Sequence, residues 1–118
     1  MNNKKFKFKN QYGGAEVYVK VEHYRNGRPV IELIDASDDT PYAVATVNMP
    51  TVLLAPDECL IKDYSENEGM LEFLTKNNIV SLTDLGVQLE HVWLPLVTLN
   101  PYNTWGRSAL PGEQFSNY

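Results

Sequence analysis

The stretch Ala55–Val80, APDECLIKDYSENEGMLEFLTKNNIV, predicts a short strand, an acidic turn, one helix and an exit toward another strand. Ser65 precedes the helical pattern and Glu68 follows three residues later, which is the spacing of a capping box. An apolar stripe comes next at helical spacing, formed by Met70, Leu71, Phe73 and Leu74. We therefore expect one long helix over about residues 66–77.

Gly69 lies inside this expected helix, where glycine costs about 1 kcal/mol relative to alanine. Two explanations stay open. Either another backbone passes close to Gly69, or the glycine is a tolerated imperfection. The pair Asn77-Asn78 provides a stop, because asparagine tolerates the left-handed conformation in which many helices end.

The bulk composition fits one soluble domain. The chain has 118 residues, of which 43% are apolar, so it is long enough for one core and short for two. A single cysteine excludes an internal disulfide framework. No apolar run reaches the roughly 20 residues that span a bilayer, and the basic N-terminus lacks the apolar centre of a signal peptide. We expect a cytoplasmic protein of a bacterial host, without membrane contact.

The net charge of −5 is unevenly distributed. Residues 1–28 carry a net charge of +5, residues 29–90 carry −10, and residues 91–118 are neutral. One explanation is two solvated faces of different charge. The other is an acidic surface for a basic, nucleic-acid-binding partner. Direct nucleic-acid binding is not expected, because the acidic body opposes it.

Alternating apolar and polar residues predict a short strand over residues 4–9, at a sheet edge, and then an antiparallel meander of three strands over residues 15–24, 29–35 and 42–49. The pair Asn26-Gly27 predicts a hairpin with a type I′ turn, in which both residues have positive φ. A short strand is expected at Asp57–Lys62, a turn at Ser81–Gly86 and a last strand at Leu89–Leu99. Pro95 places that last strand at an edge or a bulge.

The predicted fold class is α+β: a mainly antiparallel, twisted sheet of four to six strands with one helix packed on one face. Residues 1–99 form the domain, and residues 100–118 form an irregular, aromatic-containing C-terminal segment. That segment packs back on the sheet or folds against a partner, and the sequence favours neither.

The residues that could carry chemistry are few. His23, His91 and Cys59 do not have the spacing of metal ligands, and no phosphate-binding glycine motif is present. Cys59 alternates with Ile61 in a short strand, which is typical of a small buried side chain. The Asp35–Asp39 stretch lacks the glycine and closing glutamate of a calcium loop. We expect no enzyme activity, no cofactor and no metal.

Two acidic loops remain as candidates for partner binding. Carboxylates interleaved with tyrosine suit a surface that meets basic residues, although loops are commonly polar in any case. The candidate partner-binding residues are Asp35, Asp38, Asp39, Asp63, Tyr64, Glu66 and Glu68.

The runs IELID, PYAVATVN and YSENEGML resemble a family of small uncharacterised proteins carried by conjugative elements and bacteriophages of gut bacteria. The resemblance covers Ile31–Val80, and residues 100–118 depart from the family, whose chains end soon after the last strand. It implies no reaction, cofactor or catalytic residue. It implies a mobile-element setting, in which small acidic proteins block restriction or CRISPR machinery by occupying nucleic-acid-binding surfaces.

Two hypotheses follow from the sequence. The first is a non-enzymatic inhibitor of a host defence system, of the anti-CRISPR or anti-restriction type, that binds a basic or nucleic-acid-binding host protein. The alternative is a structural or self-assembling phage or plasmid protein, which forms homo-oligomers through an exposed sheet face and the C-terminal segment.

Overall fold

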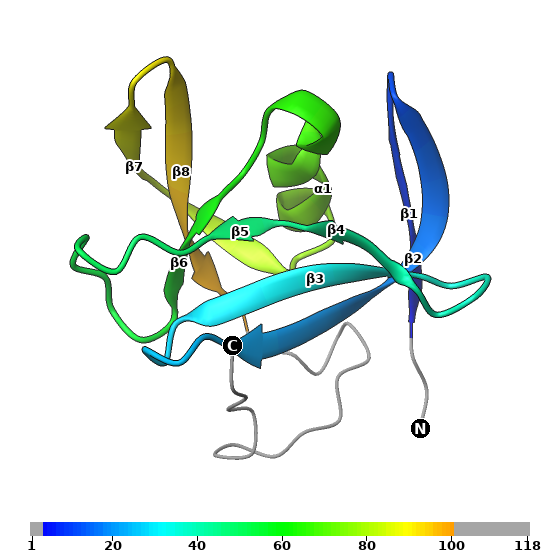
Figure 1. Ribbon diagram of the computed structural model, residues 1–118, viewed down its shortest axis with the longest axis horizontal. Coiled ribbons are helices and arrows are strands. Elements are labelled where there is room, and N and C mark those ends of the chain that lie inside the picture. The colour runs from blue at the N-terminus through cyan, green and yellow to red at the C-terminus, as the bar shows by residue number, and fades with distance from the viewer. Residues whose placement is uncertain (1–3, 101–118) are drawn as a thin grey trace.

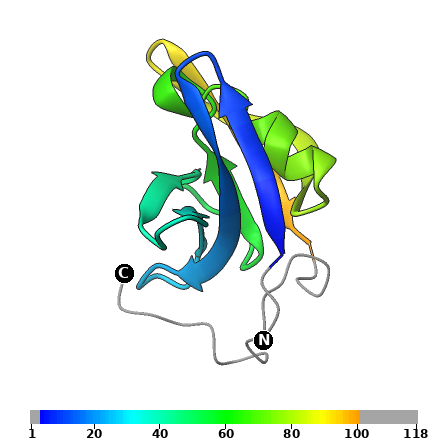
Figure 2. The same ribbon diagram turned by 90° about the vertical axis from the view of Figure 1, so that its right-hand side faces the viewer.

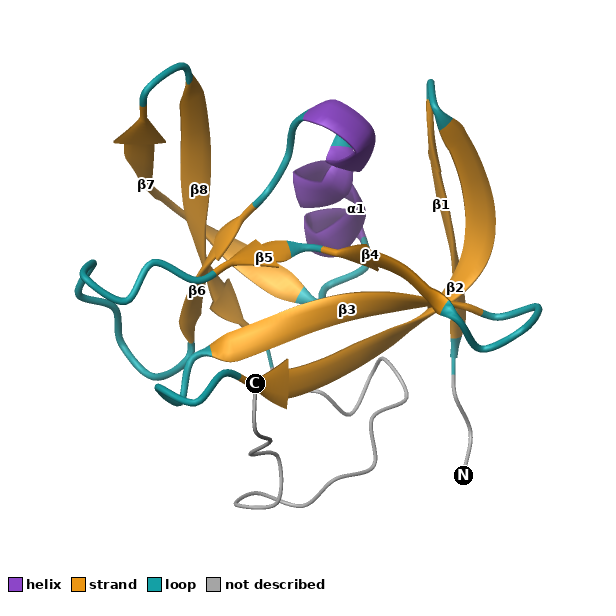
Figure 3. Cartoon of the chain, viewed as in Figure 1, coloured by secondary structure: helices purple, strands orange, loops and turns teal. Residues whose placement is uncertain are grey.

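A computed structural model describes residues 4–100, so most of the expected C-terminal segment, residues 101–118, lies outside the described residues. Figures 1 and 3 show the strands arranged around the α-helix. The elements are β1 Lys5–Asn10, β2 Gly13–His23, β3 Pro29–Asp35, β4 Pro41–Val44, β5 Thr46–Val47, β6 Glu58–Ile61, the 3-10 helix η1 Ser65–Asn67, α1 Met70–Lys76, β7 Val80–Leu89 and β8 Val92–Leu99. Within residues 4–100, no helix has the length and apolar character needed to cross a bilayer.

The strands form two antiparallel sheets of four strands each, in the orders β1-β2-β3-β4 and β5-β6-β8-β7. The chain passes from one sheet to the other at the buried residue Ala45. The Ala45 amide donates to the Ile31 carbonyl, and the Ala45 carbonyl accepts from the Lys62 amide. The predicted α+β class is confirmed. The bend at Ala45 splits the expected strand 42–49 and divides the strands between two sheets, where one sheet was expected.

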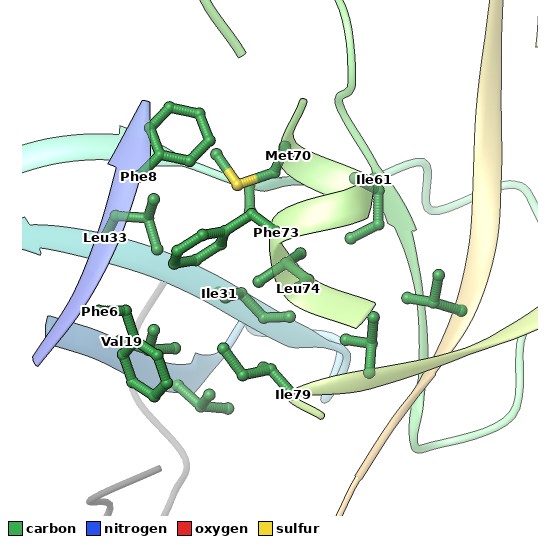
Figure 4. Close-up of a cluster of buried hydrophobic side chains, with 14 of the residues drawn as sticks. Phe6, Phe8, Val19, Ile31, Leu33, Ile61, Met70, Phe73, Leu74 and Ile79 are labelled. Carbon is green, nitrogen blue, oxygen red and sulfur yellow. The ribbon is translucent and has the colours of Figure 1, made fainter. Parts of the chain in front are cut away.

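The main core lies where α1 packs against the sheets (Figures 2 and 4). The Phe73 ring is edge-on to both phenylalanines of β1, with centroids 6.1 Å from Phe6 and 5.3 Å from Phe8. Met70 and Leu74, one turn apart on the same side of α1, are fully buried. The predicted apolar stripe is therefore the side of the helix that faces the core. Each such side chain contributes roughly 1.5–3 kcal/mol by leaving water.

The start of the helix differs from the prediction. Ser65 opens the 3-10 helix η1 with a φ of 55°, and no side-chain cap forms at the start of either helical segment. The chain then turns at Gly69, with a φ of 89°, and α1 begins only at Met70. The capping box at Ser65 is therefore wrong. Asp63 supplies the acceptor instead, because its Oδ1 accepts the Leu71 amide at 2.9 Å.

Both explanations offered for Gly69 are also wrong. A Cβ at this position would have no atom within 4 Å, so no backbone passes close by. The positive φ of Gly69, which favours glycine, allows the chain to change from η1 to α1. The expected helix 66–77 is thus a 3-10 helix of three residues followed by an α-helix of seven.

The predicted hairpin β2–β3 is confirmed, with His23 opposite Pro29. Its turn is longer than a two-residue type I′ turn, because the Tyr24 amide donates to the Arg28 carbonyl. Of the pair Asn26-Gly27, only Gly27 has the positive φ that type I′ requires at both residues. The turn expected at Ser81–Gly86 is wrong, since these residues belong to β7. The edge or bulge expected for the last strand is wrong, because β8 lies between β6 and β7 and the bulge is in β7. Pro95 is accommodated because β6 pairs with β8 only as far as Leu96, so at Pro95 the strand pairs with β7 alone.

Candidate functional site

The single cysteine, the candidate thiol nucleophile, lies buried in the core. Burial raises the pKa of the Cys59 thiol to about 12, and the nearby Asp57 and Glu58 add to the shift. A thiol with that pKa is protonated at neutral pH and is a poor nucleophile. Within residues 4–100, no three His, Cys, Asp or Glu side chains gather as metal ligands would.

The acidic loop between β3 and β4 is a local turn stabilised by its own carboxylates. Asp35 Oδ1 accepts hydrogen bonds from the Ser37 amide and hydroxyl, at 2.9 and 2.6 Å, and these bonds lower the pKa of Asp35. Asp38 Oδ1 accepts hydrogen bonds from the Thr40 amide and hydroxyl, at 3.2 and 2.7 Å. Asp39 adopts a φ of 62° at the tip. Aspartate at these positions is therefore explained by the turn itself, which uses side-chain acceptors and one positive φ.

The second acidic segment, residues 63–68, is fixed by the tip of the β1–β2 hairpin. Asn10 Nδ2 donates to the carbonyls of both Glu66 and Glu68, at 2.9 and 3.0 Å. Gln11 Nε2 donates to the Glu68 carboxylate at 3.0 Å. Glu66 also accepts from Lys62 Nζ at 2.7 Å, and this hydrogen bond lowers the pKa of Glu66.

Exposed aromatic and apolar side chains adjoin η1 on one side. The buried Asn67 donates from Nδ2 to the Val44 carbonyl at 2.8 Å, which ties η1 to β4. Val44 and Tyr42 of β4 are exposed, and the Tyr42 ring lies edge-on to Phe8 with centroids 6.1 Å apart. Tyr12 at the hairpin tip is also exposed. We call Tyr12, Tyr42, Val44, Glu66 and Glu68 the η1 surface.

On the other side, the same acidic segment borders a groove of about 510 Å³ that also involves β7 and β8. We call it the β7–β8 groove; its lining includes Asp63, Tyr64, Leu82, Asp84, Leu85 and Trp93. Leu82, Leu85 and Trp93 are 58%, 64% and 51% exposed, which is unusual for three large apolar side chains side by side. The part of the chain that the structure describes supplies no Lys or Arg to this lining.

The local backbone of β7 and β8 shapes the groove. The Trp93 indole lies over Gly86 of the neighbouring strand, where a Cβ would come within 2.5 Å of Cζ2. A bulge interrupts the pairing between Leu82 and Leu85, and Asp84 takes a φ of 66° within it. Thr83 stabilises the bulge, because its hydroxyl donates to the Leu96 carbonyl at 2.7 Å and accepts the Leu85 amide at 3.1 Å.

The seven predicted binding residues therefore lie in three places. Asp35, Asp38 and Asp39 form the β3–β4 turn. Asp63 and Tyr64 line the β7–β8 groove, and Glu66 and Glu68 belong to the η1 surface. Figure 1 shows the β3–β4 turn at the right edge of the view, away from the upper end where η1 and the β7–β8 hairpin lie.

Sequence reasoning missed the half of the groove that β7 and β8 provide. Ser81, Thr83, Asp84 and Gly86 looked like turn residues, and so the strand was not identified. A signal was present: Glu90-His91 is a two-residue connection flanked by alternating apolar residues on both sides.

Comparisons with models of protein families, with curated proteins and with solved structures give no match.

Proposed function

We propose that the protein is a non-enzymatic binding protein whose acidic segment 63–68 recognises a basic partner protein. One observation carries the proposal: this segment has exposed apolar side chains on both sides. The η1 surface contributes Tyr42 and Val44, and the β7–β8 groove contributes Leu85 and Trp93. Apolar groups that exclude water around complementary charge are typical of protein interfaces.

The charge distribution supports the same proposal. Residues 29–90, which include segment 63–68, carry a net charge of −10. In the mobile-element setting that the resemblance implies, a fitting partner is a nucleic-acid-binding protein of a restriction or CRISPR system in the bacterial cytoplasm. The inhibitor would then cover a basic surface that otherwise binds phosphates.

The test is affinity capture from a host lysate with two variants that change the net charge equally. Glu66→Lys/Glu68→Lys reverses the η1 surface, and Asp38→Lys/Asp39→Lys reverses the β3–β4 turn. Wild type and the turn variant should retain the same basic protein, and the η1 variant should lose it, provided that melting curves show all three folded. Equal retention by all three proteins would contradict the proposal.

A second candidate function is self-assembly. The observation in its favour is that β7 ends its sheet and exposes Leu82 and Leu85 beside that edge. An apolar strand at a sheet edge can pair with another copy unless charge opposes it. Light scattering of wild type and of Leu85→Lys distinguishes the candidates: an oligomer that the variant dissociates supports self-assembly, and a monomer in both cases rules it out.

A further inference from the structure

The β7–β8 groove has the features of a docking site for one kind of segment. Resting on the proposed function, we infer that it binds a stretch of the partner in which a Lys or Arg side chain stands between apolar side chains. The negative charge of the groove fits the basic side chain, and its apolar lining fits the neighbouring apolar side chains. Asp63 and Tyr64 line the groove, so the groove is continuous with the acidic segment 63–68.

The apolar requirement follows from the exposed side chains. Leu82, Leu85 and Trp93 stay more than half exposed although the bulge and Gly86 hold them in place. Covering these side chains removes apolar surface from water, so an occupant with apolar groups is favoured.

The basic requirement follows from the carboxylates. Asp63 uses Oδ1 for the Leu71 amide, and its Oδ2 has no hydrogen-bond partner among residues 4–100. The Asp84 carboxylate makes no hydrogen bond or ion pair with any described residue. His91 is the one basic residue in the described part of the lining. A Lys or Arg side chain would meet both carboxylates, and the face of Trp93 is a further site for a cation.

A second copy of this chain fits the groove less well. A symmetric dimer through the groove would bring Asp63 and Asp84 of both copies into one interface that has no Lys or Arg among its described lining residues, which like charge disfavours. The basic strand β1 does not match either, because its apolar residues Phe6 and Phe8 are already buried in the core. A partner of different sequence meets neither objection.

The test is selection from a displayed library of random twelve-residue peptides against the full chain. Asp84→Asn removes one charge while keeping a residue that tolerates positive φ, and Trp93→Ala removes the tryptophan wall of the groove. Enriched peptides should carry Lys or Arg between apolar residues. They should bind both variants at least tenfold more weakly and bind Glu66→Lys/Glu68→Lys within about twofold of wild type.

The other outcomes overturn the inference. These are no enrichment, peptides without a basic residue, or peptides that bind the two groove variants as well as wild type. Arg107→Glu tests the chain's own C-terminal segment, where Arg107 stands between Trp105 and Leu110 in sequence. A tenfold rise in peptide affinity in that variant would assign the groove to this segment instead.

Failure of this inference is separable from failure of the proposed function. If Asp84→Asn and Trp93→Ala still capture the host partner while the η1 variant does not, the proposed function stands and the groove plays no part in it. If all variants capture it equally, the proposed function itself fails.

Discussion

The indole of Trp93 occupies the space that a side chain at Gly86 would need, because a Cβ there would lie 2.5 Å from Cζ2 and 2.6 Å from Cε2. The same Cβ would lie 2.6 Å from the Leu94 carbonyl oxygen. The glycine thus allows a half-exposed tryptophan to lie against its neighbouring strand and form one wall of the β7–β8 groove.

Gly86→Ala should therefore destabilise the fold by about 1–3 kcal/mol and move the indole. Urea denaturation measures the first effect, and the tryptophan emission spectrum reports the second. The double variant Gly86→Ala/Trp93→Ala should lose less stability than the sum of the two single variants, because one clash is gone. Strict additivity would contradict this account of the contact.

Asp63→Ala should cost about 0.5–2 kcal/mol of unfolding free energy, because it removes the acceptor of the Leu71 amide at the start of α1. Ser65→Ala is the matched control and should cost less, since its side chain caps neither helical segment. Chemical denaturation of both variants compares them. A larger loss of unfolding free energy in Ser65→Ala than in Asp63→Ala would show that the Ser65 side chain caps the helix after all.

Asn10→Ala should weaken partner binding without changing any charge. Its Nδ2 holds the carbonyls of Glu66 and Glu68, so the variant removes two of the three hydrogen bonds that hold these residues to the β1–β2 hairpin. We expect a stability loss of about 1–2 kcal/mol and reduced capture of the partner. Unchanged capture by a destabilised Asn10→Ala would show that the position of these carboxylates does not matter for binding.

The thiol of Cys59 should resist alkylation at pH 8 in the folded protein and react once denaturant is added. Its pKa is raised from 9.0 to about 12, so the folded state holds the proton more tightly than the unfolded state. Stability is then fully present below about pH 9 and falls as pH rises toward about 12. Cys59→Ala should reduce this alkaline loss, and an unchanged pH profile would contradict the shift.

The sequence predicted the elements whose apolar spacing is regular. The alternation in residues 15–24 and 29–35 predicted β2 and β3, and the stripe around Phe73 predicted the buried side of α1. The bend at Ala45 could not be predicted in this way, because a change of sheet leaves the alternation of one strand intact. The bulge in β7 had the opposite effect, since Thr83 and Asp84 interrupt the alternation and resemble a turn.

The candidate site was predicted in part. The acidic segment 63–68 was identified by composition, but its two neighbouring surfaces depend on contacts between residues far apart in sequence. Asn10 lies 56 residues from Glu66, and no local pattern reports that contact. In the β3–β4 turn the contacts are local instead. Asp35 and Asp38 accept hydrogen bonds from backbone amides two residues later, a role that was not considered when these carboxylates were predicted to bind a partner.

Hydrogen–deuterium exchange of the full chain, with and without its captured partner, tests the central claim most directly. Binding at the acidic segment predicts slower amide exchange in residues 63–71, with added protection in residues 82–93 if the groove is occupied. Exchange in residues 35–40 should stay unchanged. Protection confined to the β3–β4 turn or to β1, with none in residues 63–71, would contradict the account.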